Sequence, residues 1–248
     1  MKKKYLIFTF IISLFLFYSN LAFSEDLNKK EIKTSNIKLL LSKKRILHIG
    51  DSHTVGFYGR EMDELLRNSG AIVRTYGSSG SSPSWWFNEK ETKSGFYSKD
   101  ENNNVYDPII WKTPHKTPKI EALINEFKPE IIIVSLGANL LNQNEITIKK
   151  EVNDICKFIT EKNIKLIWVG PPNGRKDKKP IEKQNFLYDN IKPIVKNYGS
   201  FIDSRDYTYY PETLKGDGVH FGGKDGKIIA QKWAKKVFEE IVKITQNE

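Results

Sequence analysis

The stretch from Arg45 to Thr54, RILHIGDSHT, is an apolar run that ends in Gly-Asp-Ser and passes directly into VGFYGREMDELLR, a helical pattern. Gly and Asp favour tight turns and Ser is a good N-cap, so a turn alone explains the tripeptide. The same geometry places a hydroxyl at the carboxyl end of a strand, where α/β sheets hold their chemistry. The rest of the chain decides between these two interpretations.

Apolar runs alternate with helical patterns along the chain. The candidate strands are Arg45–Gly50, Ala71–Tyr76, Glu130–Leu136, Ile164–Val169 and Ser200–Asp203. The candidate helices are Val55–Asn68, Lys119–Phe127, Ile146–Lys162, Ile181–Asn197 and about Asp225–Lys243. Runs such as IIIVSL are continuously apolar, as expected of parallel strands buried on both faces. The alternation predicts an α/β fold of three layers, with a doubly wound sheet of about five parallel strands.

Residues 78–117 interrupt this rhythm, because they are rich in Ser, Gly, Pro, Asn and aromatic residues without clear periodicity. A loop of this length is usually functional or disordered. Aromatic side chains such as Trp85, Trp86 and Trp111 are costly to leave in water, which argues against disorder. We therefore expect an ordered, aromatic-rich insertion at about residues 81–117, beside the functional site.

The N-terminal segment predicts export. MKKK is a basic n-region, YLIFTFIISLFLFY is an apolar h-region, and AFS at residues 22–24 approximates a cleavage site. The apolar run is shorter than the roughly 20 residues of a spanning helix. We expect a cleaved signal peptide at 1–24, a linker or lead-in at 25–43 and one domain at 44–248, in a periplasmic or secreted protein. Retention of residues 1–24 as a membrane anchor is the alternative.

The 248-residue chain has 40 Lys and Arg against 30 Asp and Glu, a net charge of +10. The basic residues are scattered, and the densest cluster, GRKDKK at 174–179, includes an acid, so solvated surface is the default interpretation. No zinc site or reading helix is evident, and no nucleic-acid partner is expected. A single cysteine, Cys156, excludes an intrachain disulfide and lies in an apolar helical stretch that predicts a buried thiol. We favour a monomer.

Polar residues follow the candidate strands at the points where each strand ends. Because the carboxyl ends of parallel strands meet at one edge of the sheet, these residues are expected to converge. A hydroxyl, backbone amides, a carboxamide and an Asp-His pair on one rim suit acyl transfer. The residues are Ser52 after the first strand, Gly77 and Gly80 after the second, Gly137 and Asn139 after the third, and Asp217 and His220 before the last helix.

These motifs resemble the SGNH, or GDSL-type, hydrolases over roughly Arg45–Val242. Gly50-Asp51-Ser52 matches the family's first block, VRTYGSSG makes Gly80 the better match to its glycine block with Gly77 in reserve, Gly137-Ala138-Asn139 matches G-x-N, and Asp217-Gly218-Val219-His220 matches D-x-x-H. Two positions depart from the family pattern: His53 replaces the usual Leu, and Leu140 replaces the common Asp. Neither departure removes a catalytic group, and both leave the substrate open.

The resemblance implies a flavodoxin-like fold and an ester hydrolase with Ser52 as nucleophile, His220 as base and Asp217 as the group that orients it. It also implies an oxyanion hole made by the amides of Ser52 and Gly80 and the side chain of Asn139. No cofactor or metal is implied. The G-x-S-x-G elbow of the α/β-hydrolases is absent from the sequence.

Four further residues are candidates for the substrate cleft: His53 as a wall or supporting donor, Trp85 and Trp86 as stacking surfaces, and His115 in the insertion. A carbohydrate esterase that removes O-acetyl groups from an envelope polysaccharide such as peptidoglycan is the leading hypothesis. A lipid esterase (lysophospholipase or thioesterase), a sugar O-acetyltransferase and a non-catalytic glycan-binding domain are the alternatives. The remaining histidine, His48, is expected to lie hydrogen-bonded in the core.

Overall fold

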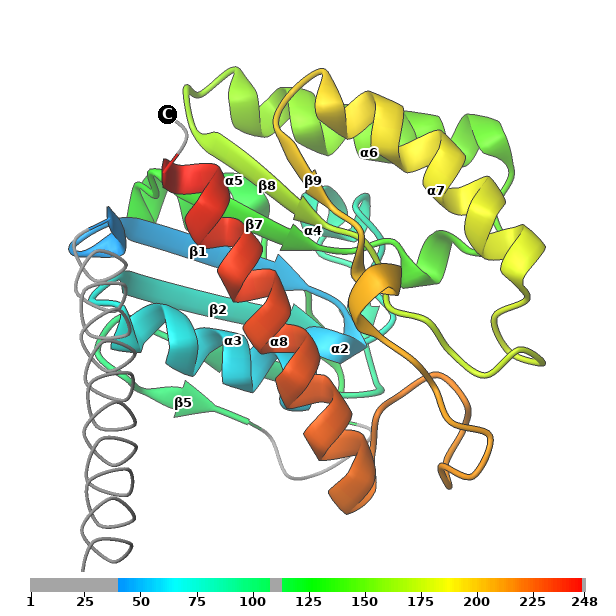
Figure 1. The fold of residues 1–248 in the computed structure, drawn as a ribbon. Helices are drawn as coiled ribbons and strands as arrows, with labels where there is room; N and C mark the ends of the chain where they lie inside the picture. The colour runs from blue at the N-terminus through cyan, green and yellow to red at the C-terminus, as the bar shows by residue number, and fades with distance from the viewer. Residues whose placement is uncertain (1–39, 108–112, 247–248) are drawn as a thin grey trace, which may run out of the picture. The chain divides into compact units, whose positions relative to one another are not determined.

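The computed structural model describes residues 40–107 and 113–246. Within these ranges the chain forms a seven-stranded sheet of order β5-β4-β2-β1-β7-β8-β9 and a small two-stranded sheet of β3 and β6 (Figure 1). Five strands are parallel: β1 (Arg45–Gly50), β2 (Ile72–Ser78), β7 (Ile131–Ser135), β8 (Lys165–Val169) and β9 (Ser200–Ile202). The expected doubly wound sheet of about five parallel strands is therefore confirmed.

β1 and β7 lie in the middle of the sheet, and their side chains are buried on both faces. Every residue of β7 is buried, and Ile46 to Gly50 are buried in β1. Gly50 at the end of β1 pairs with Gly77 of β2 and with Ser135 of β7. This register brings the residues that follow the three central strands to one edge of the sheet.

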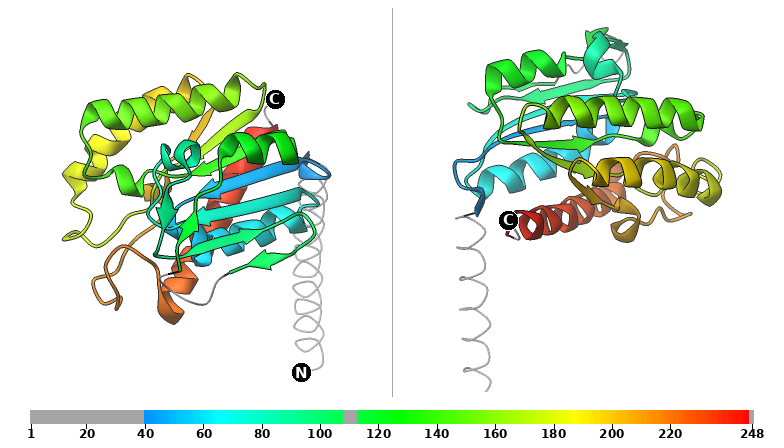
Figure 2. Two further views of the ribbon diagram at one scale, coloured as in Figure 1. Left: turned by 180° about the vertical axis from the view of Figure 1, so that it is seen from behind. Right: turned by 90° about the horizontal axis from the view of Figure 1, so that it is seen from above.

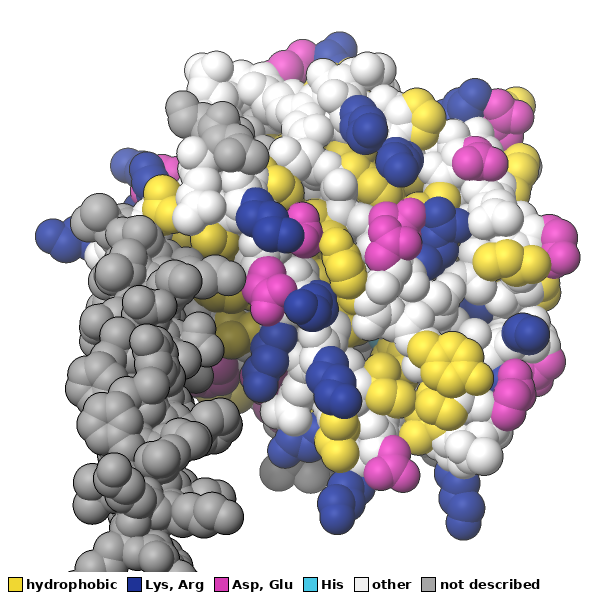
Figure 3. Space-filling view, viewed as in Figure 1, with side chains coloured by type: hydrophobic (Ala, Val, Ile, Leu, Met, Phe, Trp, Pro, Cys, Tyr) yellow, Lys and Arg dark blue, Asp and Glu magenta, His cyan; other side chains and the backbone are white. Residues whose placement is uncertain are grey.

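Helices cover both faces of the sheet and give the expected three layers (Figure 2). On one face α3 (Phe57–Asn68) packs against α8 (Gly223–Gln246). The other face carries α5 (Ile120–Phe127) and α6 (Glu145–Thr160), with α7 (Ile181–Lys196) packed beside α6. On the face that carries α8, Lys and Arg are interspersed with Asp and Glu (Figure 3). No helix in the described part of the chain has the length and apolar character needed to cross a membrane.

Two local features differ from the sequence expectation. The helix expected at Val55–Asn68 is divided at Gly56, whose backbone is extended, into α2 (Ser52–Val55) and α3. The insertion adds two antiparallel strands to the sheet, β4 (Phe96–Lys99), which pairs with β2, and β5 (Val105–Tyr106), which pairs with β4. The sheet is therefore mixed rather than wholly parallel. The insertion also forms α4 (Trp85–Asn88), β3 (Glu91–Thr92) and β6 (His115–Lys116).

The domain begins earlier than expected, because Leu41 is completely buried and belongs to the compact unit. The expected signal peptide at 1–24 and most of the expected linker lie outside the described residues, as does Trp111 of the insertion. Cys156 and His48 are both completely buried, and His48 Nε2 lies 2.9 Å from Ser135 Oγ, as expected of core residues.

Candidate active site

Each residue of the Gly-Asp-Ser turn has a different structural role. A Cβ on Gly50 would lie 2.0 Å from Thr54 Oγ1, so the tight approach of α2 to β1 requires glycine. Asp51 is the N-cap of α2, and its Oδ1 accepts a hydrogen bond of 3.0 Å from the backbone N–H of His53. The cap is therefore Asp51 and not Ser52, which leaves the Ser52 hydroxyl free for another partner. The Gly-Asp-Ser stretch is therefore a helix-capping turn and also presents a hydroxyl at the carboxyl end of the strand.

Ser52, His220 and Asp217 form one continuous chain of hydrogen-bonding groups. His220 Nε2 lies 2.7 Å from Ser52 Oγ, and His220 Nδ1 lies 2.5 Å from Asp217 Oδ2. The second carboxylate oxygen, Oδ1, accepts 2.8 Å bonds from the backbone N–H groups of Val219 and His220. Although partial burial by itself raises the pKa of Asp217, these hydrogen bonds lower that pKa to about 2. The carboxylate is thus ionised and fixed in orientation.

The loop that carries Asp217 and His220 is held by neighbouring loops. The backbone N–H of Arg175 donates to the carbonyl of Gly218 at 2.7 Å, and the N–H of Gly218 donates to the Tyr210 hydroxyl at 3.2 Å. Gly218 itself has a φ of +83°, which favours glycine. The D-x-x-H motif therefore depends on residues 174–179 for its position, although these residues lie far from it in sequence.

Three hydrogen-bond donors are the candidates for the oxyanion hole: the backbone N–H groups of Ser52 and Gly80 and the side-chain amide of Asn139. Among the described residues, none accepts a hydrogen bond from the backbone N–H of Ser52 or of Gly80. Gly80 has a φ of +83°, the left-handed conformation that glycine adopts without strain. Asn139 Nδ2 donates to the carbonyl of Ser81 at 2.9 Å, which fixes its amide beside the Gly80 loop, and no described residue accepts a bond from its second N–H. Gly77 pairs within β2, so Gly80 is the better candidate.

His53 lies behind the imidazole of His220. Its ring centroid is 5.4 Å from that of His220 and 5.7 Å from that of Trp233, and only 6% of the residue is exposed. Burial lowers the pKa of His53 well below its usual value, so the ring is neutral at ordinary pH. His53 Nε2 has no hydrogen-bond partner among the described residues. The residue is placed as a wall of the site, at the back of the triad.

Lys179 was missed by sequence analysis, which treated residues 174–179 as solvated surface. The residue is only 4% exposed, and its Nζ donates to the carbonyl of Pro172 at 3.0 Å. Burial lowers the pKa of Lys179 to about 8, against the opposing effect of the nearby carboxylates of Asp51 and Asp217. Burial likewise raises the pKa of Asp51 to about 6. Two buried ionisable groups, Lys179 and Asp51, thus influence each other electrostatically close to the triad, and the only sequence signal for them was the Asp in the GDS block.

The candidate cleft residues separate into two groups. Trp85 lies beside the oxyanion loop, because its Cη2 is 3.6 Å from the position that a Gly80 Cβ would occupy. Trp86 is completely buried in the hydrophobic core, so the prediction that it lines the cleft is wrong. In the four-residue helix α4, the indole of Trp86 points into the core although that of its neighbour Trp85 does not. His115 stacks on Phe96 with ring centroids 4.7 Å apart and contacts Tyr106 within the insertion. No contact brings His115 to the triad within the described residues.

Comparisons with known proteins identify the fold. No family model matches the chain. Protein BcsX of Komagataeibacter xylinus is 25% identical over 204 residues, which cover 77% of this chain and 75% of BcsX. The esterase EstA of Pseudoalteromonas superposes with a TM-score of 0.55 and 14% identity, over 81% of this chain and 98% of its own.

Two further solved structures share this architecture. A candidate SGNH hydrolase from Slackia heliotrinireducens has a TM-score of 0.54 and 15% identity, over 81% of this chain and all (100%) of its own. A peptidoglycan O-acetylesterase has a TM-score of 0.52 and 10% identity, over 87% of this chain and 95% of its own. The chain therefore has the fold of the SGNH hydrolases, the superfamily that its motif blocks resemble.

Proposed function

We propose that this protein is a serine ester hydrolase that works through an acyl-enzyme on Ser52. The observation that carries the proposal is the chain Ser52 Oγ–His220 Nε2 and His220 Nδ1–Asp217 Oδ2, at 2.7 and 2.5 Å. A serine, a histidine and a carboxylate in this order form the arrangement that activates a hydroxyl for attack on a carbonyl.

The reaction follows from the geometry. Asp217 accepts a hydrogen bond from the Nδ1–H of His220, so the proton stays on Nδ1 and Nε2 is left as the acceptor that faces Ser52. As Ser52 Oγ attacks the ester carbonyl, Nε2 takes its proton and then donates it to the leaving alcohol. The amides of Ser52 and Gly80 and the free N–H of Asn139 stabilise the oxyanion, at about 3 kcal/mol for each donor. Water activated by His220 then releases the acid and restores Ser52.

The proposed substrate is an O-acetylated carbohydrate of the cell envelope, such as peptidoglycan. Two features support a small acyl group in a polar setting: the indole of Trp85 packs against Gly80, and the insertion that carries it is rich in polar residues. A peptidoglycan O-acetylesterase is among the proteins that share the fold. The basic, apolar N-terminal segment supports export to the compartment that holds such a substrate.

A panel of esters tests this function. Aryl acetate, butyrate and octanoate esters are compared, followed by acetate release from O-acetylated peptidoglycan. We expect the highest kcat/KM on acetate, and loss of activity in Ser52→Ala and His220→Ala variants that retain the wild-type circular dichroism spectrum. An optimum at octanoate would favour a lipid esterase, and acetyl transfer to a sugar in preference to water would favour a transferase.

A further inference from the structure

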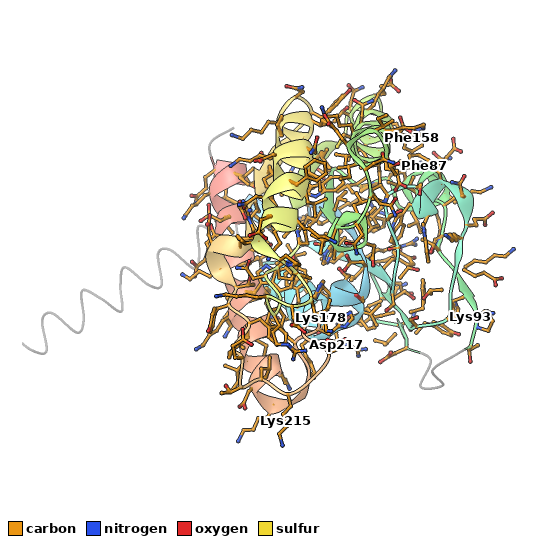
Figure 4. All side chains as sticks on the ribbon, turned by 90° about the vertical axis from the view of Figure 1, so that its right-hand side faces the viewer. Phe87, Lys93, Phe158, Lys178, Lys215 and Asp217 are labelled. Atoms are coloured by element: carbon orange, nitrogen blue, oxygen red, sulfur yellow. The ribbon has the colours of Figure 1, made fainter. Side chains whose placement is uncertain are left out.

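A groove lies between α4 and α6, outside the triad. Its volume is about 390 Å³, within the range of ligand-binding clefts. Phe87 and Phe158 meet edge to face within it, with ring centroids 5.4 Å apart, and both rings are partly exposed. Figure 4 shows these two residues next to each other, with Asp217 lying apart from them in the same view. Partly exposed aromatic rings in a groove offer apolar faces for a ligand to stack on.

Four of the five charged residues that line the groove are paired with one another, and the fifth is Glu151. Lys150 and Asp154 form an ion pair of 2.6 Å, and Lys157 and Glu161 form one of 3.7 Å. No excess of positive charge attracts a phosphate or a polyanion, and the charged rim is unsuited to an acyl chain. A neutral ligand with an apolar face and many hydroxyl groups fits this lining, because its hydroxyls can bond to the paired charges. A pyranose sugar has that chemistry.

The groove is joined to the oxyanion loop by hydrogen bonds. Glu151 Oε2, in the groove wall, accepts 2.6 and 3.0 Å bonds from Ser82 Oγ and the backbone N–H of Ser84. The carbonyl of Ser81, one residue earlier, accepts the Asn139 amide. Gly80 and Ser84 are four residues apart, so at most about 14 Å separates them. An oligosaccharide of a few sugars can therefore occupy the groove while one of its esters lies at Ser52.

We propose that the groove between α4 and α6, with Phe87 and Phe158 as its stacking surface, binds a pyranose unit of the polysaccharide a few sugars away from the ester that Ser52 attacks. This inference rests on the proposed esterase function. It makes the enzyme selective for polymers: the triad cleaves any accessible small ester, and the groove adds affinity for long glycan chains alone.

The test uses O-acetylated oligosaccharides of N-acetylglucosamine with one to six sugars, together with an aryl acetate. The variants are Phe158→Ala, which removes a stacking ring, and Lys150→Ala, which removes a polar group. The second variant is needed because Phe158 contacts the core and its loss can affect folding. Matched controls are Phe186→Ala, a partly exposed ring on α7, and Lys149→Ala, the neighbouring lysine on α6. Thermal unfolding of every variant is measured in parallel.

For the wild type we expect kcat/KM to rise about tenfold from one to six sugars through a lower KM, the gain of a stacking contact. Phe158→Ala should lose that gain and Lys150→Ala, which removes a polar contact, should reduce it, while both retain wild-type activity on the monosaccharide and the aryl acetate and both controls keep the full gain. Equal length dependence in groove variants and controls, or none in the wild type, overturns the groove assignment alone. Failure of the wild type to cleave even aryl acetate overturns the esterase proposal as well.

Discussion

Replacement of Asp217 by Asn should inactivate the enzyme by changing the tautomer of His220. Asp217 Oδ1 accepts hydrogen bonds from two backbone N–H groups, those of Val219 and His220, at 2.8 Å. In Asp217→Asn the carboxamide oxygen must remain there, because an NH2 group would face two donors. The NH2 group is then directed at Nδ1, which can accept its hydrogen bond only if the ring proton moves to Nε2. A protonated Nε2 cannot take the proton of Ser52.

The expected loss is about 10⁴-fold in kcat, as in triads where the same exchange traps the wrong tautomer, and corresponds to about 5 kcal/mol. It is measured as steady-state hydrolysis of aryl acetate, with thermal unfolding to show that the fold is intact. Because the pKa of Asp217 is about 2, the wild-type carboxylate is ionised at every practical assay pH, and the loss should appear at all of them.

Asp217→Ala is the control, since it removes the carboxylate without offering a donor to Nδ1. We expect the Asn variant to be no more active than the Ala variant, despite its closer shape to Asp. If Asp217→Asn kept more than a tenth of wild-type kcat, orientation of the imidazole by Asp217 would not be the basis of its role.

Three other changes test the surroundings of the triad. Asn139→Ala should lower kcat about a hundredfold with little change in KM, because its amide acts on the oxyanion, and a raised KM with unchanged kcat would make it a ground-state contact. Trp85→Ala should raise the ratio of kcat/KM on butyrate to kcat/KM on acetate by about tenfold, because the space left by the indole can bury the two extra methylenes of butyrate. Phe87→Ala should leave this ratio unchanged. Burial lowers the pKa of Lys179 from 10.5 to about 8, so between about pH 8 and 10.5 the unfolded chain binds more protons than the folded chain. The free energy of unfolding of the wild type should therefore rise across that window. Urea unfolding at both ends of the window should show this rise in the wild type, and an equal rise in Lys179→Met would contradict it.

The parts of the fold that were predictable are those fixed by local patterns. The alternation of apolar runs with helical patterns identified all five parallel strands, and the bounds predicted for β1, Arg45–Gly50, match the structure. Once these strands are parallel, the residues that follow them must share an edge, so the meeting of Ser52 with Asp217 and His220 could be expected from their order along the chain.

The parts that were missed depend on contacts between distant segments. β4 and β5 are short strands inside a polar insertion, and they form by pairing beside β2 rather than from their own pattern. Trp85 and Trp86 are adjacent, and only their rotation in the one-turn helix α4 decides which of them faces the oxyanion loop. Lys179 is buried because residues 174–179 fold over the Asp217 loop, which no charge pattern reveals.

Covalent trapping of the nucleophile tests the central claim most directly. The protein is incubated with an alkyl phosphonate that mimics the tetrahedral intermediate, and the modified residue is located by intact-mass measurement and peptide mapping. We expect a single adduct on Ser52, formed together with the loss of esterase activity and absent from Ser52→Ala. An adduct on another residue, or inactivation that persists in Ser52→Ala, would contradict the assignment of Ser52 as the nucleophile.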